Sequence, residues 1–274
     1  MKVKIVFSDI DGTFLTHDYL VTDKNEYAVN QLLNRHIPFV LVSARMPEAI
    51  YPITDRLGIK IPIICYSGGL VLTECEDGLY SKTIDRAIAT RLLDVLDERW
   101  AQVTINYYSG RRWFVRDVDD ARVKHEEEIT GATAYNADFY ELLEVGMLPN
   151  KILTMSEPSD CAEMERVLSD LFPELNVVRS SDILLEIMDK SVSKATGIKV
   201  MLEHYDFAPE DAIGFGDNYN DIDMFNYVGC GVAMSNAPEP VKRLVDEVTD
   251  SNDESGVYSY LVKTGVIDAF SFDG

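Results

Sequence analysis

The sequence predicts an α/β fold, a Rossmann-like core with a parallel sheet that is interrupted by an inserted α+β domain. Short apolar runs alternate with helical segments at both ends of the chain, a pattern typical of strands joined by right-handed crossovers into a parallel sheet. In the middle of the chain this rhythm gives way to an aromatic-rich hairpin and further strands. Polar clusters follow several core strands, at the sheet edge where open α/β proteins bind ligands.

The first core segment begins with a buried strand. Val3–Phe7 is an apolar run that stops at Ser8-Asp9-Ile10-Asp11-Gly12-Thr13, where Gly12 indicates a turn. Thr22 is placed to cap a helix that runs through residues 28–33. Two more strands are expected at 37–42 and 61–66, with a helix at 49–57 between them; the strands end at Ser43-Ala44-Arg45 and Ser67-Gly68-Gly69.

The middle of the chain reads as a separate module. A helix is expected at 84–99, a hairpin at 103–115 that turns near Ser109-Gly110, and a strand at 151–155. A helix at 160–171 and strands at 177–179 and 183–187 complete it. A module of about 105 residues is a normal domain size, so the sequence predicts a core made of 1–83 and 190–274 and an inserted domain at 84–189.

The last segment resumes the alternation of strand and helix. A helix at 195–205 precedes a strand at 212–216, which ends at Asp217-Asn218-Tyr219-Asn220-Asp221. A helix around 224–225, a strand at 231–234 and helices at 238–245 and 256–262 follow. The acidic stretch 246–254 is predicted to be a solvated loop.

Composition excludes several classes of protein. No apolar run approaches the ~20 residues of a membrane-spanning helix. A net charge of −22 repels nucleic acid and anionic membranes, so neither is an expected partner, although a metal and local cations can still draw a small anion into one cleft. The four cysteines lack metal-ligand spacing and the chain start lacks a signal-peptide pattern, which together predict free thiols and a cytoplasmic location.

The polar residues at the predicted sheet edge fit one reaction. They are Asp9, Asp11, Ser43, Asp217, Asn220 and Asp221, with Lys194 at the start of a helix that reaches the same edge. Carboxylates without a His or Cys cluster favour a hard octahedral cation, Mg²⁺ above all. A hydroxyl and an ammonium suit a phosphoryl group, and an Asp beside that group can attack it to give an aspartyl-phosphate.

These residues resemble, in order, the four motifs of the haloacid dehalogenase (HAD) superfamily. Asp-x-Asp-Gly-Thr matches residues 9–13, Ser43 matches the second motif, Lys194 the third, and Gly-Asp-x-x-Asn-Asp matches residues 216–221. The chain is similar over essentially its whole length to the Cof-like phosphatases, which carry a large α+β cap after the third core strand. The resemblance therefore implies that 84–189 is the cap of a HAD-type core.

The resemblance also implies a role for each motif residue. Asp9 would be the nucleophile, and Asp11 would protonate the leaving alkoxide and then deprotonate the attacking water. Mg²⁺ would be held by the Asp9 side chain, the Asp11 backbone carbonyl and Asp217, with Asp221 a further metal ligand or a support of that shell. Ser43, Lys194 and Asn220 would bind the phosphoryl group.

The chain departs from the family pattern in three places, one of which, Phe14 in place of an aliphatic residue after Thr13, is expected to be a packing change. Ser43-Ala44-Arg45 stands where Thr-Gly-Arg is frequent and keeps the hydroxyl, whereas Ser67-Gly68-Gly69 stands where Asn-Gly is frequent and leaves Ser67 without an assigned substrate contact. Arg45 either points at the site or pairs with a surface acid. Four basic residues of the cap are predicted to be solvated rather than to meet an anionic or sugar substrate: Arg111, Arg112, Lys151 and Arg179. None of the four histidines lies in a group of candidate site residues.

These observations favour a Mg²⁺-dependent phosphatase of small phosphorylated metabolites, such as sugar phosphates. A phosphotransferase or phosphosugar mutase on the same scaffold is the alternative, and its product would distinguish it. A non-enzymatic phospho-ligand sensor is a third reading, disfavoured because receiver domains are shorter and lack an inserted cap. The sequence leaves open the substrate, the cap residues that select it, and whether the protein forms a homo-oligomer.

Overall fold

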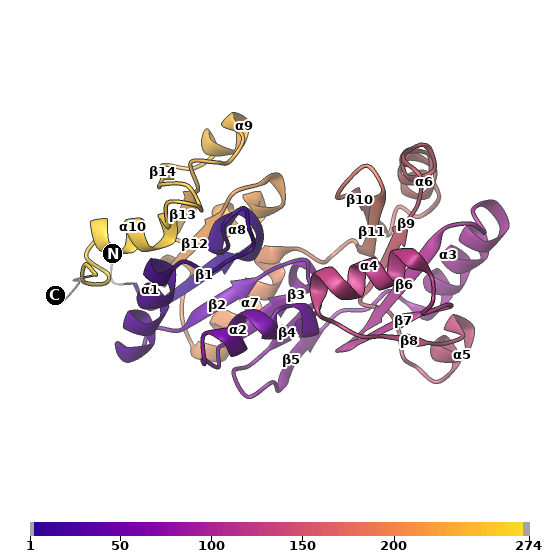
Figure 1. Cartoon of the computed structure of the whole chain (residues 1–274), viewed down its shortest axis with the longest axis horizontal. Helices are drawn as coiled ribbons and strands as arrows, with labels where there is room; N and C mark the ends of the chain where they lie inside the picture. Colours follow the sequence, from indigo (N-terminus) through magenta and orange to yellow (C-terminus); the bar gives the residue numbers. More distant parts are fainter. Residues whose placement is uncertain (1–2, 271–274) are drawn as a thin grey trace. The chain divides into compact units, whose positions relative to one another are not determined.

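The computed structural model describes residues 3–270 and divides the chain into two compact units (Figure 1). The core unit consists of Met1–Ala44, Ile53–Tyr80 and Ser193–Gly274, and the inserted unit consists of Arg45–Pro52 and Ser81–Val192. The short segment 45–52 groups with the inserted unit, although it lies inside the predicted core range 1–83.

The core unit contains an eight-stranded sheet with the order β14-β13-β12-β1-β2-β3-β4-β5. The strands from β14 to β3 are parallel to their neighbours, and β4 runs antiparallel to β3. The parallel-sheet core is confirmed. Its strands are β1 (Ile5–Asp9), β2 (Phe39–Val42), β3 (Ile63–Cys65), β4 (Leu70–Leu72), β5 (Gly78–Ser81), β12 (Ala212–Gly216), β13 (Cys230–Ala233) and β14 (Glu247–Val248).

Helices cover both faces of this sheet (Figure 1). On one face, Ile5, Phe7 and Val40 pack in a buried cluster with the apolar sides of α7 (Lys194–Tyr205) and α8 (Ile222–Tyr227). On the other, Tyr260 of α10 (Gly256–Lys263) meets Phe215 of β12, and α10 contacts α1 (Asp23–Asn34). The remaining helices of this part are the short α2 (Tyr51–Arg56) and α9 (Glu239–Lys242).

The inserted unit is an α+β module with a six-stranded sheet of order β10-β11-β9-β6-β7-β8. Neighbouring strands are antiparallel except β7 and β8. One face of the sheet packs against α3, α5 and α6 around Tyr107, Ile152 and Leu185. The strands are β6 (Thr104–Ser109), β7 (Arg112–Val115), β8 (Ala134–Asn136), β9 (Lys151–Met155), β10 (Leu175–Arg179) and β11 (Leu184–Asp189), and the helices are α3 (Arg86–Arg99), α4 (Ala121–Thr130), α5 (Phe139–Glu144) and α6 (Pro158–Leu171).

Local sequence signals account for most of these elements. The Thr22 side chain accepts a hydrogen bond from the Asn25 N–H and caps α1, as predicted. The predicted hairpin forms with Gly110 at φ 58° in its turn. In place of the helix expected at 49–57 the chain forms a single 3-10 turn at 47–49 and the short α2, because Pro52 lacks the N–H that would continue one helix from the first to the second. The four cysteines are free thiols, also as predicted.

Two further outcomes differ from, or add to, the predictions. The acidic stretch 246–254 is not simply a solvated loop, because it contributes β14 to the sheet edge and buries Asn252, whose side chain donates a hydrogen bond to the Leu15 carbonyl. The helix α4 was not predicted, since Val123 is its one buried residue and its sequence carries no apolar stripe. Within residues 3–270, no helix has the length and apolarity needed to cross a membrane.

Candidate active site

The carboxyl ends of β1, β2 and β12 bring the predicted polar residues to one edge of the core sheet. The register pairs Asp9 with Val42, so Ser43 follows one position beyond Asp9 on the neighbouring strand. On the other side Ser8 pairs with Phe215, so Asp217 lies just past the end of β12. This alignment is expected, because the carboxyl ends of parallel strands meet at the same edge of a sheet.

A single tight turn follows β1 and shapes the first motif. The Leu15 N–H donates to the Ile10 carbonyl at 2.9 Å and closes the turn. Gly12 adopts φ 78°, a conformation that favours glycine, and a Cβ there would lie 2.4 Å from a carboxylate oxygen of Asp217. The next residue, Thr13, donates its hydroxyl to the Asp217 carboxylate at 2.9 Å. The turn therefore requires glycine and ties the first motif to the fourth.

Lys194 lies at the centre of the site. It is the first residue of α7, whose N-terminus is capped by Ser193, and its side chain is 1 % exposed. Its ammonium donates to Asp9 at 2.5 Å and to Asp221 at 2.6 Å. Gly68 allows this placement, because a Cβ there would lie 1.9 Å from the Ser193 carbonyl oxygen. The backbone after β3 therefore approaches the start of α7 closely.

Asp221 organises the fourth motif. One carboxylate oxygen accepts from Lys194, and the other accepts from the backbone N–H groups of Asp217 and Asn218, both at 3.0 Å. Its side chain is fully buried. Both oxygens accept hydrogen bonds from the protein, so Asp221 holds Lys194 and the loop that carries Asp217.

The charges of the site do not balance. Burial raises the pKa of Asp9 well above its ordinary value; Lys194 opposes this, and the negative charges of Asp221 and Asp217 add to it. Burial also raises the pKa of Asp217 to about 6, although the Thr13 hydrogen bond works against the shift. Burial would lower the pKa of Lys194, but the charges of Asp221 and Asp9 outweigh it and the pKa rises. These directions are consistent, because one ammonium cannot neutralise three carboxylates.

The carboxylates are placed to hold a metal ion. Asp9, Asp217 and Asp221 each offer one oxygen, and these oxygens lie within 4.8 Å of one another. An all-oxygen donor set suits a hard divalent cation, which would also supply the missing positive charge. The residues present therefore fit a divalent metal.

The other predicted site residues differ from this cluster in burial. Asp11 is exposed, and its charge contributes to the raised pKa of Asp217. Ser43 is buried at 2 % exposure, directly after β2. Asn220 is exposed in the turn before Asp221. The catalytic, phosphate-binding and metal-binding roles of these residues stay predictions.

Sequence reasoning missed two residues that shape the site. Thr13 was recognised only as part of a motif, and its hydrogen-bond partner Asp217 lies 204 positions away in the chain. The Asp223 carboxylate accepts from the Ala195 N–H at 3.1 Å and so joins α8 to the first turn of α7. An acidic residue two positions after the fourth motif was the available signal for Asp223.

In the inserted unit, the basic residues singled out earlier differ in setting. Lys151 is 6 % exposed rather than solvated, with its ammonium 3.6 Å from Glu186 and over the ring of Tyr108. Arg111 pairs with Glu48 at 3.0 Å, and Arg179 pairs with Glu165. Arg45 groups with the inserted unit and donates to the Ala49 carbonyl at 3.3 Å. The surface default is wrong for Lys151.

Comparison with known proteins is consistent with this geometry. A family model of haloacid dehalogenase-like hydrolases matches residues 6–261. A Haemophilus influenzae protein named "Putative phosphatase" is 33% identical over 258 residues, covering 94% of this chain and 96% of that protein. A Bacillus subtilis protein named 5-amino-6-(5-phospho-D-ribitylamino)uracil phosphatase is 24% identical, covering 95% of this chain and 97% of its own.

Solved structures agree on the fold. The crystal structure of a haloacid dehalogenase-like hydrolase from Bacteroides thetaiotaomicron is 26% identical, with a TM-score of 0.86 and coverage of 96% of this chain and 100% of that one. A HAD subclass IIB sugar phosphatase is 21% identical, with a TM-score of 0.81 and coverage of 97% and 100%, and at that identity shows the fold alone.

Proposed function

The chain belongs to the haloacid dehalogenase-like hydrolases and is a phosphatase, and we propose that it hydrolyses small phosphorylated metabolites with Mg²⁺ through an aspartyl-phosphate on Asp9. The observation that carries the proposal is the position of Asp9. It lies at the end of β1, hydrogen-bonded to the buried Lys194 and within metal-binding reach of Asp217 and Asp221.

The proposed reaction divides the work between two aspartates. Asp9 attacks phosphorus, the bond from phosphorus to the leaving oxygen breaks, and Asp11 gives its proton to that oxygen. In the second step Asp11 takes a proton from water, the water oxygen bonds to phosphorus, and the Asp9–phosphorus bond breaks. Asp11 is exposed, which gives water access to its carboxylate.

The remaining residues bind and neutralise. Lys194 keeps Asp9 in place, and Lys194, Ser43 and Asn220 hold the phosphoryl oxygens. Mg²⁺, bound by Asp9, Asp217 and the Asp11 backbone carbonyl, with Asp221 supporting that shell, would neutralise charge between the nucleophile and the phosphoryl group. Because Asp11 lends only its backbone to the metal, its side chain stays free to carry a proton.

The substrate class and setting are part of the proposal. A net charge of −22 argues against nucleic acid or an anionic membrane surface and leaves a small phosphorylated metabolite as the substrate class. A cytoplasmic location is also part of the proposal, supported by the scattered free cysteines. The relative named as a phosphatase of a phosphorylated ribityl compound supports a sugar-like phosphomonoester. A homo-oligomer is compatible with the proposal.

Phosphate release from a panel of phosphomonoesters, with and without Mg²⁺, tests the function. We expect Mg²⁺-dependent release that is lost in Asp9→Asn, and a phosphorylated protein after acid quench in the wild type but not in the variant. An isomerised phosphosugar without free phosphate would instead indicate a mutase. Full activity of Asp9→Asn, or no release from any ester, would contradict the proposal.

A further inference from the structure

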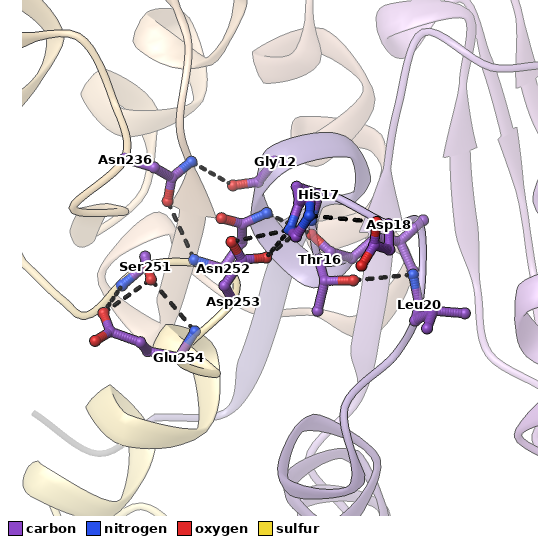
Figure 2. Close-up of polar contacts among 11 residues, drawn as sticks. Gly12, Thr16, His17, Asp18, Leu20, Asn236, Ser251, Asn252, Asp253 and Glu254 are labelled. Carbon is purple, nitrogen blue, oxygen red and sulfur yellow. Dashed lines mark hydrogen bonds and ion pairs between the residues drawn. The ribbon is translucent and has the colours of Figure 1, made fainter.

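The turn that carries Asp11 is held from outside by a segment distant in the sequence. Figure 2 shows Asn236 and the loop 251–254 beside the segment 12–20. The Asn236 side chain donates to the Gly12 carbonyl at 2.9 Å, and the Asn252 side chain donates to the Leu15 carbonyl at 2.9 Å. The His17 N–H then donates to Asp253 at 2.9 Å. Three hydrogen bonds therefore hold the chain from Gly12, inside the first motif, to His17 just after it.

The two asparagines act as a connected pair. The backbone N–H of Asn252 donates to the side-chain oxygen of Asn236 at 3.1 Å, as Figure 2 shows. The amide of Asn236 has one orientation that satisfies both neighbours, because its oxygen must face an N–H and its nitrogen must face a carbonyl. Asn252 is 6 % exposed, and its loop is closed by the hydrogen bond from the Ser251 hydroxyl to Glu254 at 2.8 Å. Asn236 is therefore oriented by the buried Asn252 at the base of an internally hydrogen-bonded surface loop.

The atom that Asn236 contacts lies in the middle of the first motif. Gly12 stands between Asp11 and Thr13, and its carbonyl belongs to the peptide that leads into Thr13. The Thr13 side chain is held by its hydrogen bond to Asp217. Asn236 and Asp217 thus hold the two residues that follow Asp11, and the orientation of Asp11 depends on both contacts.

We propose that Asn236 is a positioning residue of the phosphatase, which fixes the turn bearing Asp11 through its hydrogen bond to the Gly12 carbonyl. This inference rests on the proposed function for its effect on turnover, because it assumes that Asp11 moves the proton. Asn236 itself is exposed, and its side chain makes contact with backbone only. Its removal therefore affects the geometry of the turn more than the stability of the core.

Local sequence does not predict the role of Asn236. Asn236 follows β13 in a turn that leads to α9, where an asparagine is ordinary. Its partner Asn252 lies in the acidic stretch that was predicted to be solvated. The function of both side chains becomes visible only when residues more than 200 positions apart in the chain are brought together.

Two substitutions separate the hydrogen bond from the charge. Asn236→Asp keeps the acceptor for the Asn252 N–H and replaces the donor to Gly12 with a carboxylate oxygen, whereas Asn236→Ala removes both contacts without adding charge. Ser235→Ala is the matched control, since the hydrogen bonds of Ser235 in the structure are made by its backbone. All three would be compared with the wild type in the full chain.

We expect both Asn236 variants to lower kcat by about 10- to 100-fold with KM for the best ester little changed, as for a catalytic group slightly misplaced. Amide hydrogen exchange over residues 10–17 should become roughly tenfold faster in both, and the Leu15 N–H that closes the turn should show it most. Ser235→Ala should match the wild type in kcat, KM and exchange.

The outcomes separate this inference from the proposed function. If the wild type releases no phosphate but both variants speed exchange over residues 10–17, the turn is held as inferred and the proposed function fails. If the wild type is active and both variants keep its kcat and its exchange rates, the inference fails and the function stands. A lower kcat in Asn236→Asp alone would also overturn the inference, because charge rather than the lost hydrogen bond would be responsible.

Discussion

The two sheets of this protein bury charge in different places. In the core unit the charges lie at the carboxyl ends of parallel strands, where Asp9 and Asp221 share the ammonium of Lys194 and the half-buried Asp217 lies beside them. In the inserted unit, Lys151 and Glu186 lie inside antiparallel strands and contact each other across the sheet. At the strand ends three carboxylates gather around one ammonium, whereas on the sheet face Lys151 forms its ion pair with one carboxylate, that of Glu186.

The imbalance has a physical consequence. The Lys151 ammonium has the Glu186 carboxylate as its ion-pair partner within the protein. The three carboxylates of the core unit exceed their partner, and burial raises the pKa values of Asp9 and Asp217 as a result. The core arrangement is therefore complete only with additional positive charge, and this difference separates a reactive site from a structural contact.

The largest test of this comparison concerns proton transfer. Asp11→Asn should lower kcat by about 10²–10⁴-fold while Mg²⁺ still binds, because the proposed metal contact of Asp11 is its backbone. Asp217→Ala should weaken Mg²⁺ binding itself. Glu186→Gln in the inserted unit should leave kcat and Mg²⁺ affinity unchanged. Turnover kinetics and calorimetric Mg²⁺ titration measure both quantities.

Two results would break the comparison. Equal loss of Mg²⁺ affinity in Asp11→Asn and Asp217→Ala would show that the two aspartates do not divide the work as proposed. A lower kcat in Glu186→Gln would show that the buried charges of the inserted unit take part in chemistry, and a higher KM alone would assign them to substrate recognition.

A second test compares the two buried lysines by stability. Lys194→Met leaves two buried carboxylates without a cation and should cost about 3–5 kcal/mol of unfolding free energy at neutral pH. Lys151→Met should cost about 1–2 kcal/mol, since its partner Glu186 keeps some access to water. Urea unfolding of both variants measures the difference, and equal losses would refute the contrast between strand end and sheet face.

The contrast also explains what the sequence could predict. Polar residues at strand ends follow apolar runs in the sequence, so the positions of Asp9, Ser43 and Asp217 at the sheet edge could be predicted from the strands alone. Lys151 sits at the start of a strand in the inserted unit, and whether its side chain faces solvent or a partner depends on strand pairing across the sheet. Its burial could not be predicted, because cross-strand neighbours are not encoded by local pattern.

The missing elements have a similar cause. Helix α4 lacks an apolar stripe, and β8 has only three residues, so neither produces a periodic signal. The hydrogen bonds of Thr13 and Asn252 join positions more than 200 residues apart. Local sequence thus predicted the parallel sheet and the motif residues, whereas the contacts that orient those residues could be identified only in the folded structure.

A third test uses pH. The pKa of Asp217 is about 6 in the folded, metal-free protein and 3.8 is its ordinary value, so the unfolded chain releases this proton at lower pH. The unfolding free energy of metal-free protein should therefore fall as pH rises from about 4 to about 6. Mg²⁺ binds the ionised carboxylate, so the increase in Tm on adding Mg²⁺ should be larger at pH 7.5 than at pH 5.

Matched variants locate that effect in the core unit. Asp217→Asn should reduce the fall in stability between pH 4 and pH 6 and shrink the increase in Tm with Mg²⁺, whereas Glu186→Gln should preserve both. Thermal melts across this pH range, with EDTA or Mg²⁺, give both measurements. An increase in Tm with Mg²⁺ that is the same at pH 5 and pH 7.5 in the wild type would contradict the role of Asp217.

The smallest expected effect comes from a pair of similar hydrogen bonds. The Thr13 hydroxyl donates to Asp217 in the core unit, and the Thr104 hydroxyl donates to Asp120 in the inserted unit. Thr13→Val and Thr104→Val should each lower stability by about 1–3 kcal/mol, because each removes a hydrogen bond to a carboxylate. Only Thr13→Val should also weaken Mg²⁺ binding, by about threefold to tenfold, since Thr13 lowers the pKa of Asp217 and fixes its orientation. Unchanged Mg²⁺ affinity in Thr13→Val, measured by calorimetry, would mean that the hydrogen bond stabilises the fold without tuning the metal site.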